Sequence, residues 1–230
     1  MNLHELQKQV FDQIDKNTPN SQLYKTKDIQ KRLNVYHRGM KSRLKQALTA
    51  DFEESIPLLK NFDGLFESFF KSIQSYHFSL SEYYKLWSDW ILNHKDIEEA
   101  TKALTHLERL QQDSYFKAYS LSPQWQSFLI DAHTVIINPS FTVEQFDWDV
   151  NENLKKMKTY VAVWTRQATV YTESISYEEF VVLLALIKGQ SLEQSLSLIE
   201  KIYKKEELLN WLQNSVEKWT VNGWLILNES

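Results

Sequence analysis

The chain has 230 residues, 43% of them hydrophobic and 13% aromatic, which is enough for one large core or two smaller ones and argues against disorder. It contains no cysteine, so disulfides, thiolate catalysis and thiolate metal sites are excluded. Its formal net charge of −4 works against non-specific attraction to DNA.

The hydrophobic residues do not form a membrane-spanning segment. The longest uncharged apolar run covers residues 180–187, far short of a membrane span, and residues 1–6 lack the apolar core of a signal peptide. We therefore expect a cytoplasmic protein that contacts no membrane.

A basic amphipathic helix is predicted over residues 28–52, after a short helix over residues 1–15 and turn formers at 17–21. Its apolar residues recur every three or four positions and share one face: Ile29, Leu33, Tyr36, Met40, Leu44, Leu48 and Phe52. Between residues 25 and 45 the chain carries eight basic side chains against Asp28 alone, so the remainder is acidic. Such a segregated basic face favours contact with a partner, although a solvated helix face gives the same pattern.

Further helices are predicted through the first half of the chain. Residues 54–75 have a helical apolar pattern broken near 61–64, and residues 96–112 form another helix. Between them, serines at 79 and 81 can cap a helix that contains Trp87 and Trp90. These two tryptophans share a helix face, and we expect core packing rather than an exposed interface anchor. Residues 1–124 are therefore predicted to form a helical bundle domain.

The pattern changes in the second half, where β-branched and aromatic residues alternate in part. Residues 160–166 and 168–172 are predicted to be the arms of a β-hairpin that turns near Gln167, and Gly189 is expected to end a helix. The other predicted elements are strands over 125–137, 141–148 and 224–227 and helices over 177–188, 192–202 and 206–218. The predicted fold class is α+β, with residues 125–230 forming a winged-helix-like domain with a small antiparallel sheet. Such domains bind DNA through a helix or peptides through a sheet edge.

No catalytic pattern is evident. The acidic clusters at 51–54, 147–149 and 178–179 have no neighbouring base that defines a role, and serines occur in no Gly-x-Ser-x-Gly elbow. No two histidines lie three or four residues apart, as a helical metal-ligand pair would: they are His4, His37, His77, His94, His106 and His133. We therefore expect no catalytic residue, no metal site and no cofactor in this chain.

Several motifs occur in an order that is characteristic of one protein family. They are Arg32-Leu-Asn-Val-Tyr-His-Arg38, Arg43-Leu-Lys-Gln-Ala-Leu48 with Asp51 and Phe52, Asn138-Pro-Ser140, Val161-Ala-Val-Trp-Thr-Arg166 and the segment 183–196. In this respect the chain resembles, from about Asp28 to Leu227, a bacterial family once labelled a putative DNA-binding domain. It departs from that family at Glu53, where a proline is usual, and has Pro57 instead.

Members of that family are non-catalytic partners of iron-dependent, TIM-barrel oxidases that modify cysteines in ribosomally made precursor peptides. The aromatic segment 78–91 is similar in character to the methanobactin-type partners, whose products are copper-binding peptides. The resemblance implies a heterodimer in which this chain binds the leader peptide and the oxidase carries the iron. It does not indicate which precursor or which cysteine is involved. The alternative is a DNA-binding transcriptional regulator, and an enzyme in its own right has least support.

Two sites follow from this interpretation. We expect the oxidase to be held by residues of the basic helix, namely Arg32, Tyr36, Arg38 and Arg43. We expect the leader peptide to add a strand beside the hairpin, at Tyr160, Val161, Val163, Trp164 and Tyr171. If both arms of the hairpin are internal strands, no edge is free for the peptide.

Overall fold

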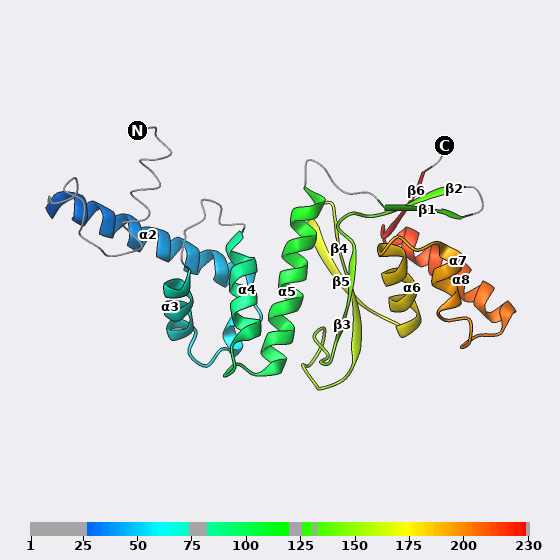
Figure 1. The fold of residues 1–230 in the computed structure, drawn as a ribbon, viewed down its shortest axis with the longest axis horizontal. Coiled ribbons are helices and arrows are strands. Elements are labelled where there is room, and N and C mark those ends of the chain that lie inside the picture. The colour runs from blue at the N-terminus through cyan, green and yellow to red at the C-terminus, as the bar shows by residue number, and fades with distance from the viewer. Residues whose placement is uncertain (1–26, 74–81, 120–125, 131–132, 229–230) are drawn as a thin grey trace. The chain divides into compact units, whose positions relative to one another are not determined.

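The computed structural model describes residues 27–73, 82–119, 126–130 and 133–228, and its fold is α+β, as predicted (Figure 1). The chain divides into two compact units, Met1–Thr105 (unit 1) and His106–Ser230 (unit 2). The sequence-based domain boundary at residue 124 stays a prediction. The short helix expected over residues 1–15 and the caps at Ser79 and Ser81 lie outside the described residues.

Unit 1 is helical throughout its described part. The break predicted near residues 61–64 is the start of a helix, because the Asn61 side chain accepts a hydrogen bond from the Gly64 backbone N–H at 3.1 Å. The last helix begins and ends later than the predicted 96–112 and contributes residues to both units. The elements are α2 (Lys27–Asp51), η2 (Ile56–Leu58), α3 (Phe62–Ser72), α4 (Tyr83–Asn93) and α5 (Glu99–Ala118).

The described part of the predicted apolar stripe packs inward, whereas the side chains of Ile29, Leu33 and Tyr36 lie outside the described part. Leu44, Leu48 and Phe52 are buried, and Met40 packs against the same core. Trp87 lies at the centre of this core, completely buried, with its ring 5.1 Å from the Phe69 ring in an edge-on arrangement and 5.7 Å from the Trp90 ring. Trp87 is therefore a core residue, as predicted, and Trp90 is partly buried and packs against the same core.

Unit 2 contains two three-stranded antiparallel sheets, in the orders β1-β2-β6 and β3-β4-β5. The region 125–137, where strands were predicted to begin, contains two strands that pair with each other. The helix predicted over 192–202 ends at Ser197. The Ser195 hydroxyl donates to the backbone carbonyl of the N-cap residue Ser191, and the Ser197 hydroxyl donates to that of Gln194. Side-chain bonds of this kind compete with the regular helix.

The strands of unit 2 are β1 (Gln126–Ile130), β2 (His133–Ile137), β3 (Thr142–Phe146), β4 (Thr159–Arg166), β5 (Thr169–Ile175) and β6 (Leu225–Asn228). Its helices, besides the end of α5, are α6 (Tyr177–Ile187), α7 (Leu192–Ser197) and α8 (Lys205–Val221).

The predicted hairpin is β4–β5. Arg166 pairs with Thr169, so the turn consists of Gln167 and Ala168, whose φ angles are 49° and 64°. Two consecutive left-handed residues are what a tight hairpin turn of type I′ requires. The predicted turn near Gln167 is therefore confirmed. The helix stop at Gly189 is also confirmed, since its φ is +80°.

Both faces of the sheet β3-β4-β5 are covered (Figure 1). On one face, Ala162 and Trp164 of β4 join a core with residues of α6 and α8. On the other face, the Ser114 hydroxyl of α5 lies 2.9 Å from the Thr165 hydroxyl. Strand β4 is consequently buried along most of its length.

No helix among the described residues is both long and apolar enough to cross a membrane.

Candidate functional site

The basic face of α2 contains two kinds of cation. Lys41 and Lys45 are paired within unit 1, since their ammonium groups contact the carboxylates of Glu67 and Asp63 on α3 at 2.5 Å. These lysines also lie 5.5 Å from the ring centres of Phe70 and Phe62, respectively. The two lysines thus help to hold α3 against α2.

Arg38 and Arg43 differ from these lysines. Both are exposed, and neither forms an ion pair with any residue that the structure describes. Arg32 and Tyr36 lie within α2, but the structure does not describe their side chains. A guanidinium group presents donors in a planar fork that matches a carboxylate. Arg38 and Arg43 are therefore placed where a carboxylate of a partner can reach them.

The residues expected to bind peptide lie on different strands. Tyr160, Val161, Val163 and Trp164 all belong to β4, which is the central strand and pairs with β3 on one side and β5 on the other. Val161 and Val163 are completely buried. A central strand has no backbone groups left for an added strand. The edge that this hairpin can offer is therefore β5, not β4.

Strand β5 has only one strand neighbour among the described residues. The side chain of Tyr171 on this strand is 43% exposed, and its ring stacks on that of Trp164 at 5.4 Å. The end of α8 lies near the same hairpin, because Arg166 donates a hydrogen bond to the backbone carbonyl of Val221 at 3.1 Å. Val221 is 67% exposed. An extended peptide along β5 would therefore meet the backbone groups on the side of β5 away from β4, and the exposed side chains of Tyr171 and Val221.

A polar network ties β5 to the helices. The Lys218 ammonium on α8 lies 2.9 Å from both the Glu173 carboxylate on β5 and the Glu179 carboxylate on α6. Asn222 donates to Glu173 at 3.0 Å, and the Trp219 indole N–H donates to Glu179 at 3.2 Å. These contacts fix the outer strand of the sheet against α8.

Burial and hydrogen bonding act in opposite directions on Lys218. Burial lowers the pKa of this ammonium, but the hydrogen bonds and negative charges of Glu179 and Glu173 outweigh burial, so its pKa lies above the usual lysine value. Lys218 consequently stays charged throughout the neutral range. Sequence reasoning missed this network, because Lys218 is 39 residues from Glu179 along the chain.

Titratable residues elsewhere in unit 2 include one histidine beside a carboxylate. His106 Nε2 lies 4.0 Å from Glu144 Oε2, and hydrogen bonding to His106 holds the pKa of the Glu144 carboxyl below its usual range despite burial. Across the described ranges, no group of three or more His, Asp or Glu side chains is arranged to hold a metal ion.

The sequence was also compared with known proteins. No protein-family model matches the chain, and no curated protein matches it. The resemblance to the oxidase-partner family therefore stays a proposal.

Proposed function

We propose that the chain is a non-catalytic partner that binds the leader of a ribosomally made precursor peptide and docks it to an iron-dependent TIM-barrel oxidase. The oxidase modifies cysteines of that peptide in the biosynthesis of a copper-binding product of methanobactin type. In this proposal residues 1–124 act as a helical bundle. Residues 125–230 act as a winged-helix-like domain, consistent with the antiparallel sheet β3-β4-β5 followed by α6, α7 and α8.

The observation that carries the proposal is the edge of β5. This strand has one strand neighbour among the described residues, and Tyr171 on it is exposed. Backbone hydrogen bonds from such an edge supply affinity for an extended peptide, and exposed side chains supply selectivity. Tyr160, Val161, Val163 and Trp164 then support the edge strand from β4. Tyr171 is left to contact the peptide itself.

Docking needs no chemistry on this chain. Holding a peptide and an oxidase in one complex makes the meeting of cysteine and active site an intramolecular event, at an effective concentration in the millimolar range. The iron and the reacting groups belong to the oxidase, and Arg38 and Arg43 of α2 contact its acidic surface. The partner and the peptide are thus bound by different surfaces.

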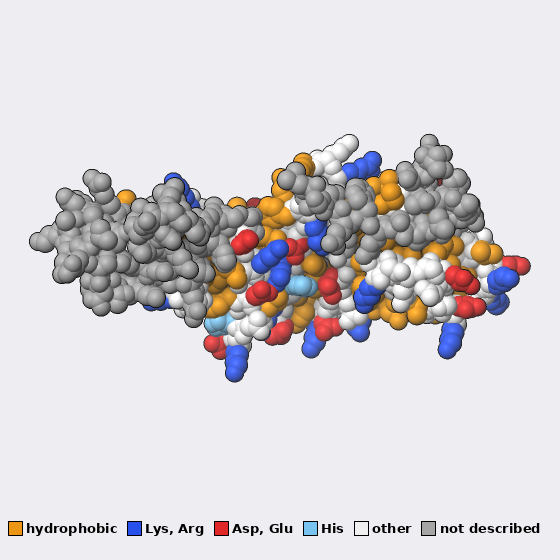
Figure 2. Space-filling view, turned by 45° about the horizontal axis from the view of Figure 1, so that its top comes forward, with side chains coloured by type: hydrophobic (Ala, Val, Ile, Leu, Met, Phe, Trp, Pro, Cys, Tyr) orange, Lys and Arg blue, Asp and Glu red, His pale blue; other side chains and the backbone are white. Residues whose placement is uncertain are grey.

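Co-purification tests the proposal. We expect the affinity-tagged chain, co-expressed with the oxidase and a cysteine-bearing precursor peptide encoded beside its gene, to retain both. Iron should be recovered with the complex and absent from the chain purified alone. Retention of specific DNA, without oxidase or peptide, would instead favour the regulator. On the face drawn in Figure 2, basic and acidic side chains of the described residues are interspersed.

A further inference from the structure

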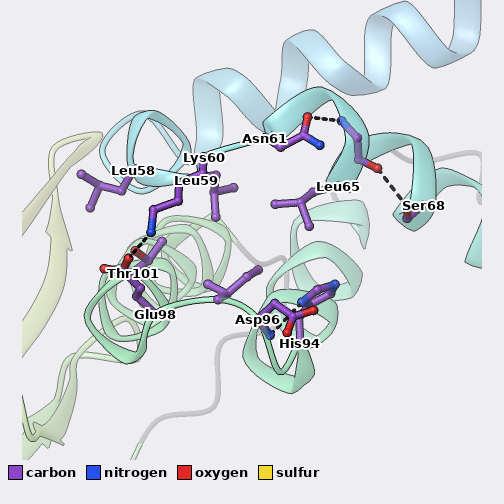
Figure 3. Close-up of a pocket in the computed structure, with 12 residues that line it drawn as sticks. Leu58, Leu59, Lys60, Asn61, Leu65, Ser68, His94, Asp96, Glu98 and Thr101 are labelled. Carbon is purple, nitrogen blue, oxygen red and sulfur yellow. Dashed lines mark hydrogen bonds and ion pairs between the residues drawn. The ribbon is translucent and has the colours of Figure 1, made fainter.

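Unit 1 contains a pocket of about 540 Å³ that neither the peptide edge nor the basic helix explains. It lies between the segment from Leu58 to Ser68 and the connection from α4 to α5 (Figure 3). Its apolar part consists of leucine and isoleucine side chains, among them Leu65 and Ile97. Leu58 at the pocket is 45% exposed. Apolar side chains together with a few polar groups are typical of the lining of a binding pocket.

The pocket wall formed by α3 is held in place. The Asn61 side chain is engaged in capping α3 through the Gly64 backbone N–H. A side chain at residue 64 would collide with the Asn61 amide group. The Ser68 hydroxyl donates to the Gly64 carbonyl at 3.0 Å. These contacts leave the wall preformed, which lowers the entropy cost of binding.

The opposite wall presents the side chains of His94 and Asp96. The His94 ring lies 4.7 Å from the Trp90 ring, and its Nδ1 accepts a hydrogen bond from the Asp96 backbone N–H at 3.3 Å. The Asp96 carboxylate is exposed and has no ion-pair partner within the ranges that the structure describes. Figure 3 shows His94 and Asp96 together at one end of the pocket.

The charges around the pocket favour a cationic group in the ligand. One basic residue lines it, Lys60, and its ammonium already lies 2.9 Å from the Glu98 carboxylate. Two acidic residues line it, Glu98 and Asp96, so the lining carries an excess of one negative charge. The carboxylate of Asp96 can therefore pair with an ammonium or guanidinium group of a ligand. The apolar lining residues, which form the apolar floor of the pocket, can pack against a neighbouring hydrocarbon group.

We propose that this pocket is a second docking site, which accepts an apolar side chain of a partner polypeptide together with an adjacent lysine or arginine. The apolar side chain packs on Leu65 and Ile97, and the cation pairs with Asp96. The site lies within unit 1 and does not depend on the leader-binding function of β5. It gives the chain a contact of opposite polarity to the basic face of α2.

Nuclear magnetic resonance titration of the isotope-labelled full chain tests this inference. The probe is acetyl-Leu-Lys-methylamide, and its matched probes carry Glu in place of Lys or Gly in place of Leu. We expect the Leu-Lys probe to shift the amide signals of Gly64, Asp96 and Glu98 and to bind about five-fold more tightly than the Leu-Glu probe. The Gly-Lys probe should bind more weakly because it leaves the apolar floor uncovered.

Two variants separate the pocket from general electrostatics. Asp96→Asn should weaken binding of the Leu-Lys probe about three- to five-fold. Glu53→Gln makes the same change of charge at an exposed residue outside the pocket and should leave the affinity unchanged. The proposal would be overturned if the pocket amides do not shift up to the solubility limit of the probe. Equal affinity for the Leu-Lys and Leu-Glu probes, or equal effects of the two variants, would also overturn it.

Discussion

Replacing Arg38 and Arg43 together with glutamate should weaken binding of the oxidase by about 100-fold or more. Both side chains are exposed and have no ion-pair partner among the described residues, so the change should not disturb the fold. Each substitution replaces a bidentate donor to a carboxylate with a group that repels it. Affinity is best measured by isothermal titration of the purified oxidase with the variant chain.

The control for this experiment is Lys155→Glu with Lys156→Glu. Both lysines are exposed in the connection between β3 and β4, and the double variant has the same change in net charge. It should bind the oxidase with nearly unchanged affinity, because it leaves the guanidinium groups of Arg38 and Arg43 in place. If both double variants weaken binding equally, the attraction is a property of overall charge and α2 is not the docking surface.

Replacing Glu179 with alanine should lower the free energy of unfolding by about 3 kcal/mol. The carboxylate is buried, and it accepts hydrogen bonds from Lys218, the Trp219 indole N–H and the Ser176 backbone N–H. Its loss leaves a buried indole donor without a partner and removes half of the capping box of α6. Lys218 keeps its contact with Glu173, which limits the loss.

Chemical denaturation of the variant, followed by circular dichroism, measures this change. Glu178→Ala is the matched control, since it is the neighbouring acid in the first turn of α6 but is not part of this network. Its effect should stay below about 1 kcal/mol, the usual range for a charge near a helix start. Equal destabilisation by the two variants would show that Glu179 acts only as a helix-terminal charge.

The features that could be predicted from the sequence are those that depend on residues close together along the chain. The spacing of Leu44, Leu48 and Phe52 predicted the buried face of α2, and the alternation around Gln167 predicted the β4–β5 hairpin. Gly189 ends its helix for a local reason, because its positive φ suits glycine.

The features that the sequence could not predict depend on contacts between residues that are far apart along the chain. Nothing in residues 160–172 shows that β3 covers the second edge of β4, which buries Val161 and Val163 and leaves β5 as the edge strand. In the sequence the acid at 179 has no neighbouring base that defines a role. It lies in the first turn of its helix but is buried, because Lys218 and Trp219 come from a helix far along the chain.

Amide hydrogen exchange with and without the leader peptide tests the central claim most directly. The proposal predicts slower exchange in β5 (Thr169–Ile175) when the leader is bound, because amides of the edge strand gain hydrogen bonds. Amides of β4, which already pairs on both sides, should change little. Slower exchange confined to unit 1, with no change in β5, would contradict the account and move the peptide site to the first half of the chain.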